Sequence, residues 1–215
     1  MKPLKIILII LSLAVLSIPN YAALAFNDIV GGFGNGDGKN QQIEEYVVAG
    51  AKSFIESNKN TLALINEFEV NPSQATDISA AFTFTENALR QLQDSRSHYS
   101  KAKELAEQAG YNMTMITKFK AFDYDGYIDK YGLNKEIAKI AESYLKAGNL
   151  LGIYQKNINN LDAIIITLTS IRDTLKSGEP PKIRILWDCI HQYASAFLLG
   201  NYATRLSVKI IHNVE

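Results

Sequence analysis

Apolar residues recur at three- and four-residue steps over long stretches of this sequence, and this spacing is the period of an α-helix. We expect helices over residues 41–68, 78–109, 134–175 and about 183–211. The apolar face of the first contains Ile43, Val47, Gly50, Phe54, Leu62, Ile65 and Phe68, and only Asn58 interrupts it. The inner face of the second contains Ile78, Phe82, Thr85, Leu89, Leu92, Tyr99, Ala102, Ala106 and Ala109. A helix with one apolar face must bury that face, and long helices joined by short connections do so by packing antiparallel. The sequence therefore predicts an all-α fold: an antiparallel bundle of about four long helices, with a short helix or loop inserted between the second and the third.

Proline and glycine mark the ends of the expected helices. Pro72 cannot continue one helix but suits the first turn of the next, and Gly110 closes the second stretch. Gly178 and Pro180 stop the third stretch. Residues 113–132 have no regular period and are rich in phenylalanine and tyrosine, so we assign the inserted short helix or loop to them.

The third stretch is longer than the other three, and Gly148 and Gly152 lie near its middle. A straight helix of that length would reach about 65 Å, at roughly 1.5 Å per residue. Helices often kink at glycine. Both a continuous helix and one broken at Gly148 and Gly152 agree with the pattern.

The first 25 residues have the pattern of a secretory signal peptide. A short basic start precedes an apolar run that ends at Ile18, and Ala23-Leu24-Ala25 has the small residues that a signal peptidase needs. The run has about 13 residues, fewer than the roughly 20 of a bilayer-spanning helix. We therefore expect cleavage before Phe26 and a periplasmic or secreted protein. The expected parts are a signal peptide (1–25), a flexible glycine-rich leader (26–40) and a helical-bundle domain (41–215).

The charge and the cysteine content of the chain limit the partners and the covalent links that we expect. The chain carries 22 basic and 22 acidic residues, so no net charge favours nucleic acid or an anionic membrane surface. Cys189 is the only cysteine, which rules out an intramolecular disulfide. Phe26 rather than a cysteine follows the expected cleavage point, so we expect no stable membrane anchor after cleavage. We interpret Cys189 as a small side chain packed among apolar neighbours.

Metal and haem motifs that helical bundles use are missing from the sequence. It contains neither CxxCH nor HExxH, and none of its 3 histidines follows a glutamate by three residues. Asp123, Asp125 and Asp129 form a weak candidate cation site, because their spacing does not fit a calcium-binding loop. A solvated acidic turn is the simpler interpretation. We expect no cofactor.

A candidate polar patch lies on one face of the expected fourth helix, at Arg184, Asp188, His191 and Ser195. At helical spacing, Asp188 is within reach of both Arg184 and His191. A catalytic serine normally sits on a strained turn beside an oxyanion hole, whereas a regular helix uses its own amides. We therefore interpret the patch as an outer polar stripe with one ion pair, and alternatively as a ligand-contacting surface.

The same face becomes apolar farther along the helix, at Leu198, Leu199, Tyr202 and Leu206. A helix that is apolar on every side must be buried or covered. We expect either an internal cover, by residues 113–132, or a second molecule, since exposed apolar patches mark interaction surfaces. The pattern favours the internal cover.

Three functions agree with these observations. The main hypothesis is an exported, non-enzymatic bundle that acts in protein–protein interaction or assembly, with an unknown protein partner or further copies of itself. The alternative is a small-molecule-binding bundle whose tyrosines line an apolar cavity. The tyrosines on or near the packed helices are Tyr144, Tyr154, Tyr193 and Tyr202. An enzyme that uses Asp188 and His191 is the least favoured.

Overall fold

The computed structural model describes residues 38–69, 78–111 and 150–211, apart from some side chains near the end of the last range. These ranges hold the helices α2 (Gly38–Glu69), α3 (Ile78–Gln108), α6 (Leu150–Lys176) and α7 (Ile183–Ile211). Helix α2 packs against α3, α3 against α6, α6 against α7, and α7 against α2. The four helices therefore form a closed ring around one core.

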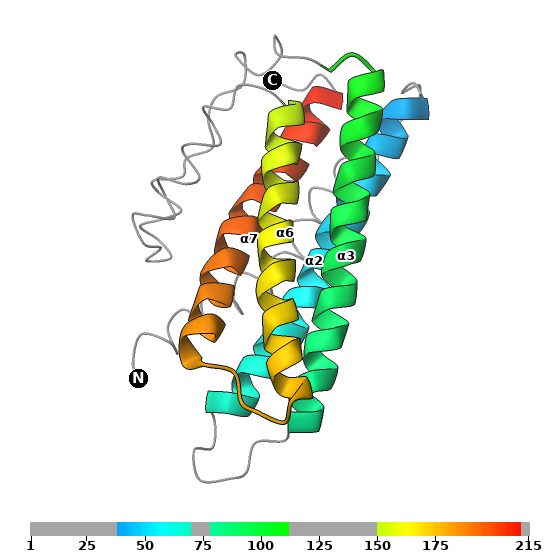
Figure 1. Ribbon diagram of the computed structural model, residues 1–215. Helices are drawn as coiled ribbons and strands as arrows, with labels where there is room; N and C mark the ends of the chain where they lie inside the picture. Colours follow the sequence, from blue (N-terminus) through cyan, green and yellow to red (C-terminus); the bar gives the residue numbers. More distant parts are fainter. Residues whose placement is uncertain (1–37, 70–77, 112–149, 212–215) are drawn as a thin grey trace.

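Neighbouring helices run in opposite directions along the bundle. In Figure 1 the chain descends α2, ascends α3, descends α6 and ascends α7. The helices have between 27 and 32 residues, so each is about 40–48 Å long at roughly 1.5 Å per residue. Matched lengths let each helix contact its neighbours from end to end. The predicted all-α antiparallel bundle is confirmed.

Helix boundaries follow the predicted ones at several ends. Helix α3 ends at Gln108, one residue before the predicted end, and α7 extends over the predicted residues 183–211. The predicted start of the second helix, around Pro72, lies outside the described residues. Helix α2 begins at Gly38, so it includes the last residues that the sequence assigned to the leader. Helix α6 is continuous through Gly152, so of the two alternatives left open by the sequence the continuous helix holds at that residue. Gly148 lies outside the described residues.

Glycine ends two of the helices in the way that the sequence predicts. Gly110 has a φ of 75°, a left-handed conformation in which a side chain would be strained. The N–H of Tyr111 donates to the carbonyl of Ala106 at 3.1 Å. The N–H of Gly110 donates to the carbonyl of Glu107 at 3.0 Å, which completes a Schellman cap. Gly178, with a φ of 82°, ends α6 with the same pair of bonds.

Small side chains let α2 and α3 approach closely. Gly50 lies against Tyr99, and a Cβ at Gly50 would be 2.9 Å from a carbon of that ring. The hydroxyl of Ser95 donates to the carbonyl of Gly50 at 2.8 Å, so the contact is polar as well as steric. Several alanines of α3 are completely buried: Ala81, Ala88, Ala102 and Ala106. Any larger side chain at Gly50 would push the two helices apart.

The core is one cluster of side chains from all four helices. The predicted inner face of α2 is confirmed at Ile43, Val47 and Phe54, which are buried. One prediction for the same helix is wrong, because Leu62, expected in the core, is only half-buried. Asn58, the one polar residue on the expected apolar face, is buried. The inner face of α2 therefore continues through polar residues.

Several predictions fall outside the described residues and stay predictions. They concern the signal peptide (1–25), the inserted segment (113–132), the candidate cation residues Asp123, Asp125 and Asp129, and Tyr144. Within the described ranges, no helix is both long and apolar enough to cross a membrane.

Candidate functional site

The predicted polar patch lies on the outside of α7. Arg184, Asp188 and His191 are exposed, whereas Ser195 is half-buried and accepts a hydrogen bond from Asn160 of α6 at 3.2 Å. Among the described residues, no ion pair joins Asp188 to Arg184 or to His191. The structure thus places the four side chains on one helix without bringing an Asp, a His and a Ser into mutual hydrogen bonding.

A line of apolar and aromatic side chains runs beside this patch. Trp187 is half-buried and stacks on His191, with ring centroids 6.1 Å apart and planes inclined by 27°. Ile183 is one helical turn before Trp187, and 72% of its surface is exposed. Steps of four residues keep these side chains on one side of the helix. We call Ile183, Trp187 and His191 the α7 ridge.

The predicted apolar interaction surface farther along α7 has four residues, and the structure describes the side chain of one of them, Leu199. Leu199 is 2% exposed, so a partner could reach it only after a rearrangement of the bundle. The side chains of Leu198, Tyr202 and Leu206 lie outside the part that the structure describes. The choice between an internal cover and a second molecule stays open for these three.

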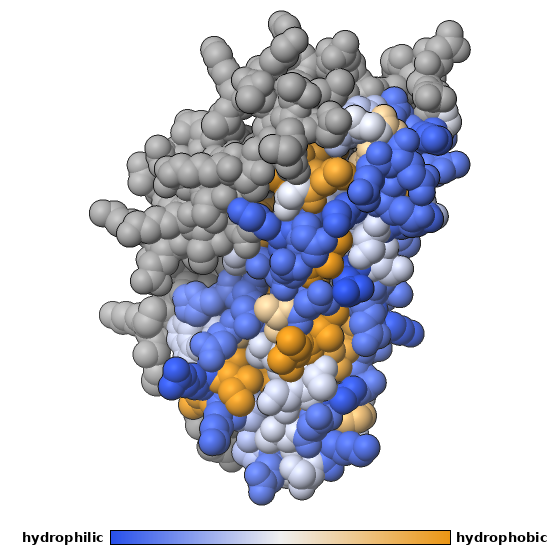
Figure 2. All heavy atoms as spheres, turned by 45° about the horizontal axis from the view of Figure 1, so that its top comes forward, coloured by the Kyte–Doolittle hydropathy of each residue, from blue (hydrophilic) through white to orange (hydrophobic). Residues whose placement is uncertain are grey.

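Elsewhere on the surface the apolar side chains are scattered. Figure 2 shows one face of the molecule on which several apolar areas are separated by hydrophilic side chains. Ile166 of α6 is 71% exposed, but its exposed neighbours along the helix, Asn159 and Ser170, are polar. Single exposed apolar residues are normal on soluble proteins. The α7 ridge differs because an aromatic pair lies beside its isoleucine.

A chain of buried hydroxyl groups joins α2, α3 and α7. The hydroxyl of Ser57 donates to the carbonyl of Ala88 at 2.7 Å, because a carbonyl can only accept. Tyr193 therefore donates to Ser57, at 2.6 Å, and Thr61 donates to the hydroxyl of Tyr193 at 2.9 Å. Every hydroxyl hydrogen of the chain is used, and the three side chains are buried.

A second buried pair joins α6 and α7. Ser207 donates to the carbonyl of Ala203 at 2.6 Å, one turn back on the same helix. The hydroxyl of Tyr154 donates in turn to Ser207. Tyr154 and Tyr193, two of the tyrosines proposed for a ligand cavity, thus bond to side chains of the protein itself. This arrangement explains their burial without a ligand.

Burial keeps the acidic side chains of the core neutral. It raises the pKa of Tyr99 to about 12, although the polar groups of Thr204 and Asn157 oppose the shift. Burial likewise raises the pKa of Tyr154 and of Tyr193 above the ordinary 10.0. The pKa of the Cys189 thiol rises to about 12 for the same reason. None of these groups can act as an anion near neutral pH, and the packed interpretation of Cys189 is confirmed.

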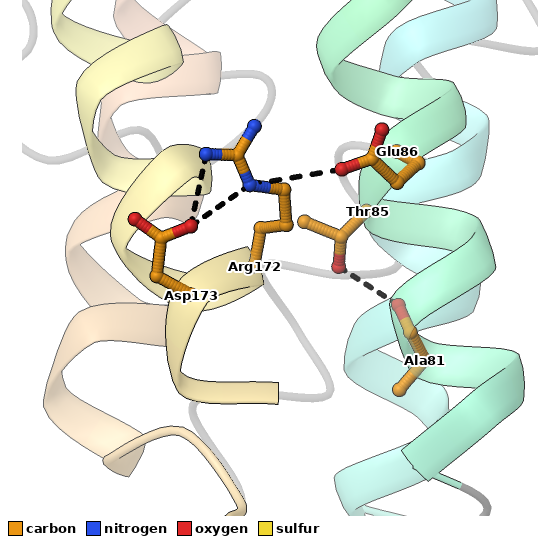
Figure 3. Close-up of polar contacts among 5 residues, drawn as sticks. All are labelled: Ala81, Thr85, Glu86, Arg172 and Asp173. Atoms are coloured by element: carbon orange, nitrogen blue, oxygen red, sulfur yellow. Dashed lines mark hydrogen bonds and ion pairs between the residues drawn. The ribbon is translucent and has the colours of Figure 1, made fainter. Parts of the chain in front are cut away.

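Ion pairs on the surface of the bundle link α3 and α6. Figure 3 shows Arg172 of α6 between Asp173, at 2.9 Å, and Glu86 of α3, at 3.6 Å. Arg96 of α3 forms a two-pronged pair with Asp162 of α6. These pairs are solvent-exposed, so each stabilises the bundle by at most about 1 kcal/mol. They align the two helices and form no chemical site.

Several buried polar residues were not predicted from the sequence. Ser57, Asn58, Thr61, Asn157 and Ser207 are each at most 2% exposed, and none of them was assigned a role. Their signal in the sequence is a small polar residue at a position that the helical period assigns to the core. That signal is weak, because the partner of each residue lies on another helix.

No metal site is found in the described part of the chain, where no three His, Cys, Asp or Glu side chains gather as possible ligands. Comparison of the chain with protein-family models, with curated proteins and with solved structures finds no match. The proposals below therefore depend on the sequence and the structure alone.

Proposed function

We propose that this protein is an exported, non-enzymatic helical bundle that acts by binding another protein, either a different one or a further copy of itself. The observation that carries the proposal is the α7 ridge, with its exposed Ile183 and its stacked Trp187 and His191. The exposed side chain of Ile183 presents apolar surface to water. Covering that surface with a partner would be favourable.

Aromatic side chains support an interface more strongly than an isolated aliphatic one. Tryptophan is enriched among the residues that contribute most to binding, because it buries a large area with few rotatable bonds. Stacking on His191 restricts the ring of Trp187 further, so less rotamer freedom would be lost on binding. Arg184 and Asp188 flank the ridge and would form the polar rim of such a contact.

A photo-crosslinking amino acid at residue 183 tests this proposal in the cells that produce the protein. The matched control places the same amino acid at residue 166, because Ile183 and Ile166 are 72% and 71% exposed. We expect a covalent adduct with one protein at residue 183 and none at residue 166. Equal labelling at both positions, or none at residue 183, would contradict the proposal.

Light scattering after size-exclusion chromatography separates the two kinds of partner. If copies of the chain bind one another through the ridge, Trp187→Ala should lower the measured mass to that of the monomer. If the partner is a different protein, the purified chain should be monomeric with and without the substitution. The protein cross-linked to residue 183 should then have a sequence other than that of this chain.

Export is proposed from the sequence of residues 1–25 alone. Mass spectrometry of the intact protein from its natural cells should find a mature chain that begins at Phe26. Retention of Met1 in the folded protein would overturn the export proposal and leave the binding proposal unaffected.

A further inference from the structure

Asn157 of α6 lies near enough to the Tyr99 hydroxyl to oppose the rise of the Tyr99 pKa, yet its amide forms no hydrogen bond of normal geometry with the described residues. The residue is 1% exposed. Within the described part of the chain, neither its Nδ2 nor its Oδ1 has a hydrogen-bond partner. Buried polar groups in folded proteins almost always have one, because an unpaired amide has lost its bonds to water and gained nothing. A donor and an acceptor therefore lie side by side in the core.

Three helices meet at this amide. Gly200 of α7 faces it, and a Cβ at Gly200 would lie 3.9 Å from both Nδ2 and Oδ1 of Asn157. The same Cβ would be 3.2 Å from the hydroxyl oxygen of Tyr99, which comes from α3. The carbonyl of Gly200 accepts from Thr204 at 2.7 Å and keeps its second lone pair. A glycine without a side chain is thus surrounded by polar atoms.

The chemistry of these groups limits what can bind them. An apolar molecule would leave the amide unpaired. An ion would need a buried counter-charge, and the buried polar residues of the described ranges are all neutral. The ligand must therefore be neutral and must both donate and accept. Water meets all of these conditions, and buried waters typically make about three hydrogen bonds.

We propose that one water molecule binds between α3, α6 and α7, where it bridges the Asn157 amide and the Tyr99 hydroxyl. The site is independent of the α7 ridge and of the proposed function. It gives Asn157 a role in fixing the position of α6 against α3, through a ligand that both helices contact.

Magnetic relaxation dispersion of water ¹⁷O counts long-lived buried waters, and the Asn157→Leu variant isolates this one. Leucine has nearly the shape of asparagine and offers no hydrogen bond, so we expect the variant to lose the contribution of one long-lived water. Asn159→Leu is the matched control, because Asn159 is two residues away on the same helix and exposed. This control should keep the full contribution. Equal contributions in the wild-type protein and in Asn157→Leu would overturn the proposal.

A second measurement needs only the wild-type protein and stays decisive if Asn157→Leu fails to fold. Rotating-frame NMR should show a cross-peak between water and the side-chain amide protons of Asn157, with the sign of a long-lived contact. Native mass spectrometry should show the mass of the chain without an added organic compound. Absence of the cross-peak, or a bound organic compound that Asn157→Leu removes, would overturn the water site.

Discussion

The hydroxyl of Tyr193 makes a testable contribution to stability because both of its hydrogen bonds are buried. Tyr193→Phe leaves Thr61 without an acceptor and Ser57 without its donor. We expect the free energy of unfolding to fall by about 1–3 kcal/mol, the usual cost of unpaired buried groups. Urea denaturation measures the change. Tyr46→Phe is the control, because Tyr46 is only half-buried, and it should shift stability by less than about 0.5 kcal/mol.

Equal losses in the two variants would contradict the hydroxyl chain. A double-mutant cycle with Thr61→Val sharpens the result, because both substitutions remove the same hydrogen bond. The double variant should therefore lose less stability than the sum of the single variants.

Cys189 gives a second test at the residue scale, through its reactivity. Only the thiolate attacks thiol reagents, and burial raises the pKa of this thiol to about 12. At pH 8 we expect the folded protein to resist a chromogenic disulfide reagent and the urea-unfolded chain to react fully. Rapid labelling in the folded state, at a rate independent of urea, would show that the thiol is accessible.

Residue-scale prediction from the sequence succeeded where one helix decides the outcome. Tyr99 and Thr85 lie on the predicted inner face of α3, and both are buried as expected. Asn58 lies on the predicted inner face of α2 and is buried, although its polarity alone would favour the surface. The partner of Ser57 is Tyr193, 136 residues away, so only the fold reveals that a hydroxyl can be satisfied in the core.

At the scale of the helices, the C-terminal cap of α6 can be tested with a substitution that adds a single methyl group. Gly178 has a φ of 82° and nothing within 4 Å of the position of a Cβ, so Gly178→Ala introduces backbone strain and no clash. We expect a loss of about 1–2 kcal/mol in the free energy of unfolding, the cost of a left-handed residue with a side chain. Gly38→Ala is the matched control.

Gly38 also has open space around a Cβ, but its φ lies outside the left-handed range. Alanine is the better helix former, so Gly38→Ala should leave stability unchanged or raise it. A similar loss in both variants would contradict the role of the cap at Gly178. Thermal unfolding followed by circular dichroism measures both changes.

Helix ends were predictable because their signals are local. Glycine and proline around residues 178–181 end one helix and begin the next, and the structure places the boundaries of α6 and α7 there. The outer face of α7 was less predictable. The sequence indicated a polar patch there, whereas the stack of Trp187 on His191 depends on how far α7 turns its side chains out of the core.

At the scale of the whole molecule, the bundle holds several neutral acids in its core. Burial raises the pKa of three tyrosines above the ordinary 10.0: Tyr99, Tyr154 and Tyr193. It also raises the pKa of the Cys189 thiol above the ordinary 9.0. An unfolded chain releases these protons at the ordinary values, while the folded chain keeps them. The folded state therefore binds more protons than the unfolded state above about pH 9.

The free energy of unfolding must consequently fall as the pH rises through 9 and 10. Each buried acid that the unfolded chain ionises contributes a slope of about 1.4 kcal/mol per pH unit. Urea midpoints measured between pH 7 and 11 should be constant at first and then decrease steeply. Because Tyr193→Phe removes one of the ionising groups, its stability should decrease with a shallower slope. A stability that does not change up to pH 11, or identical slopes in both proteins, would show that these side chains ionise without unfolding the bundle.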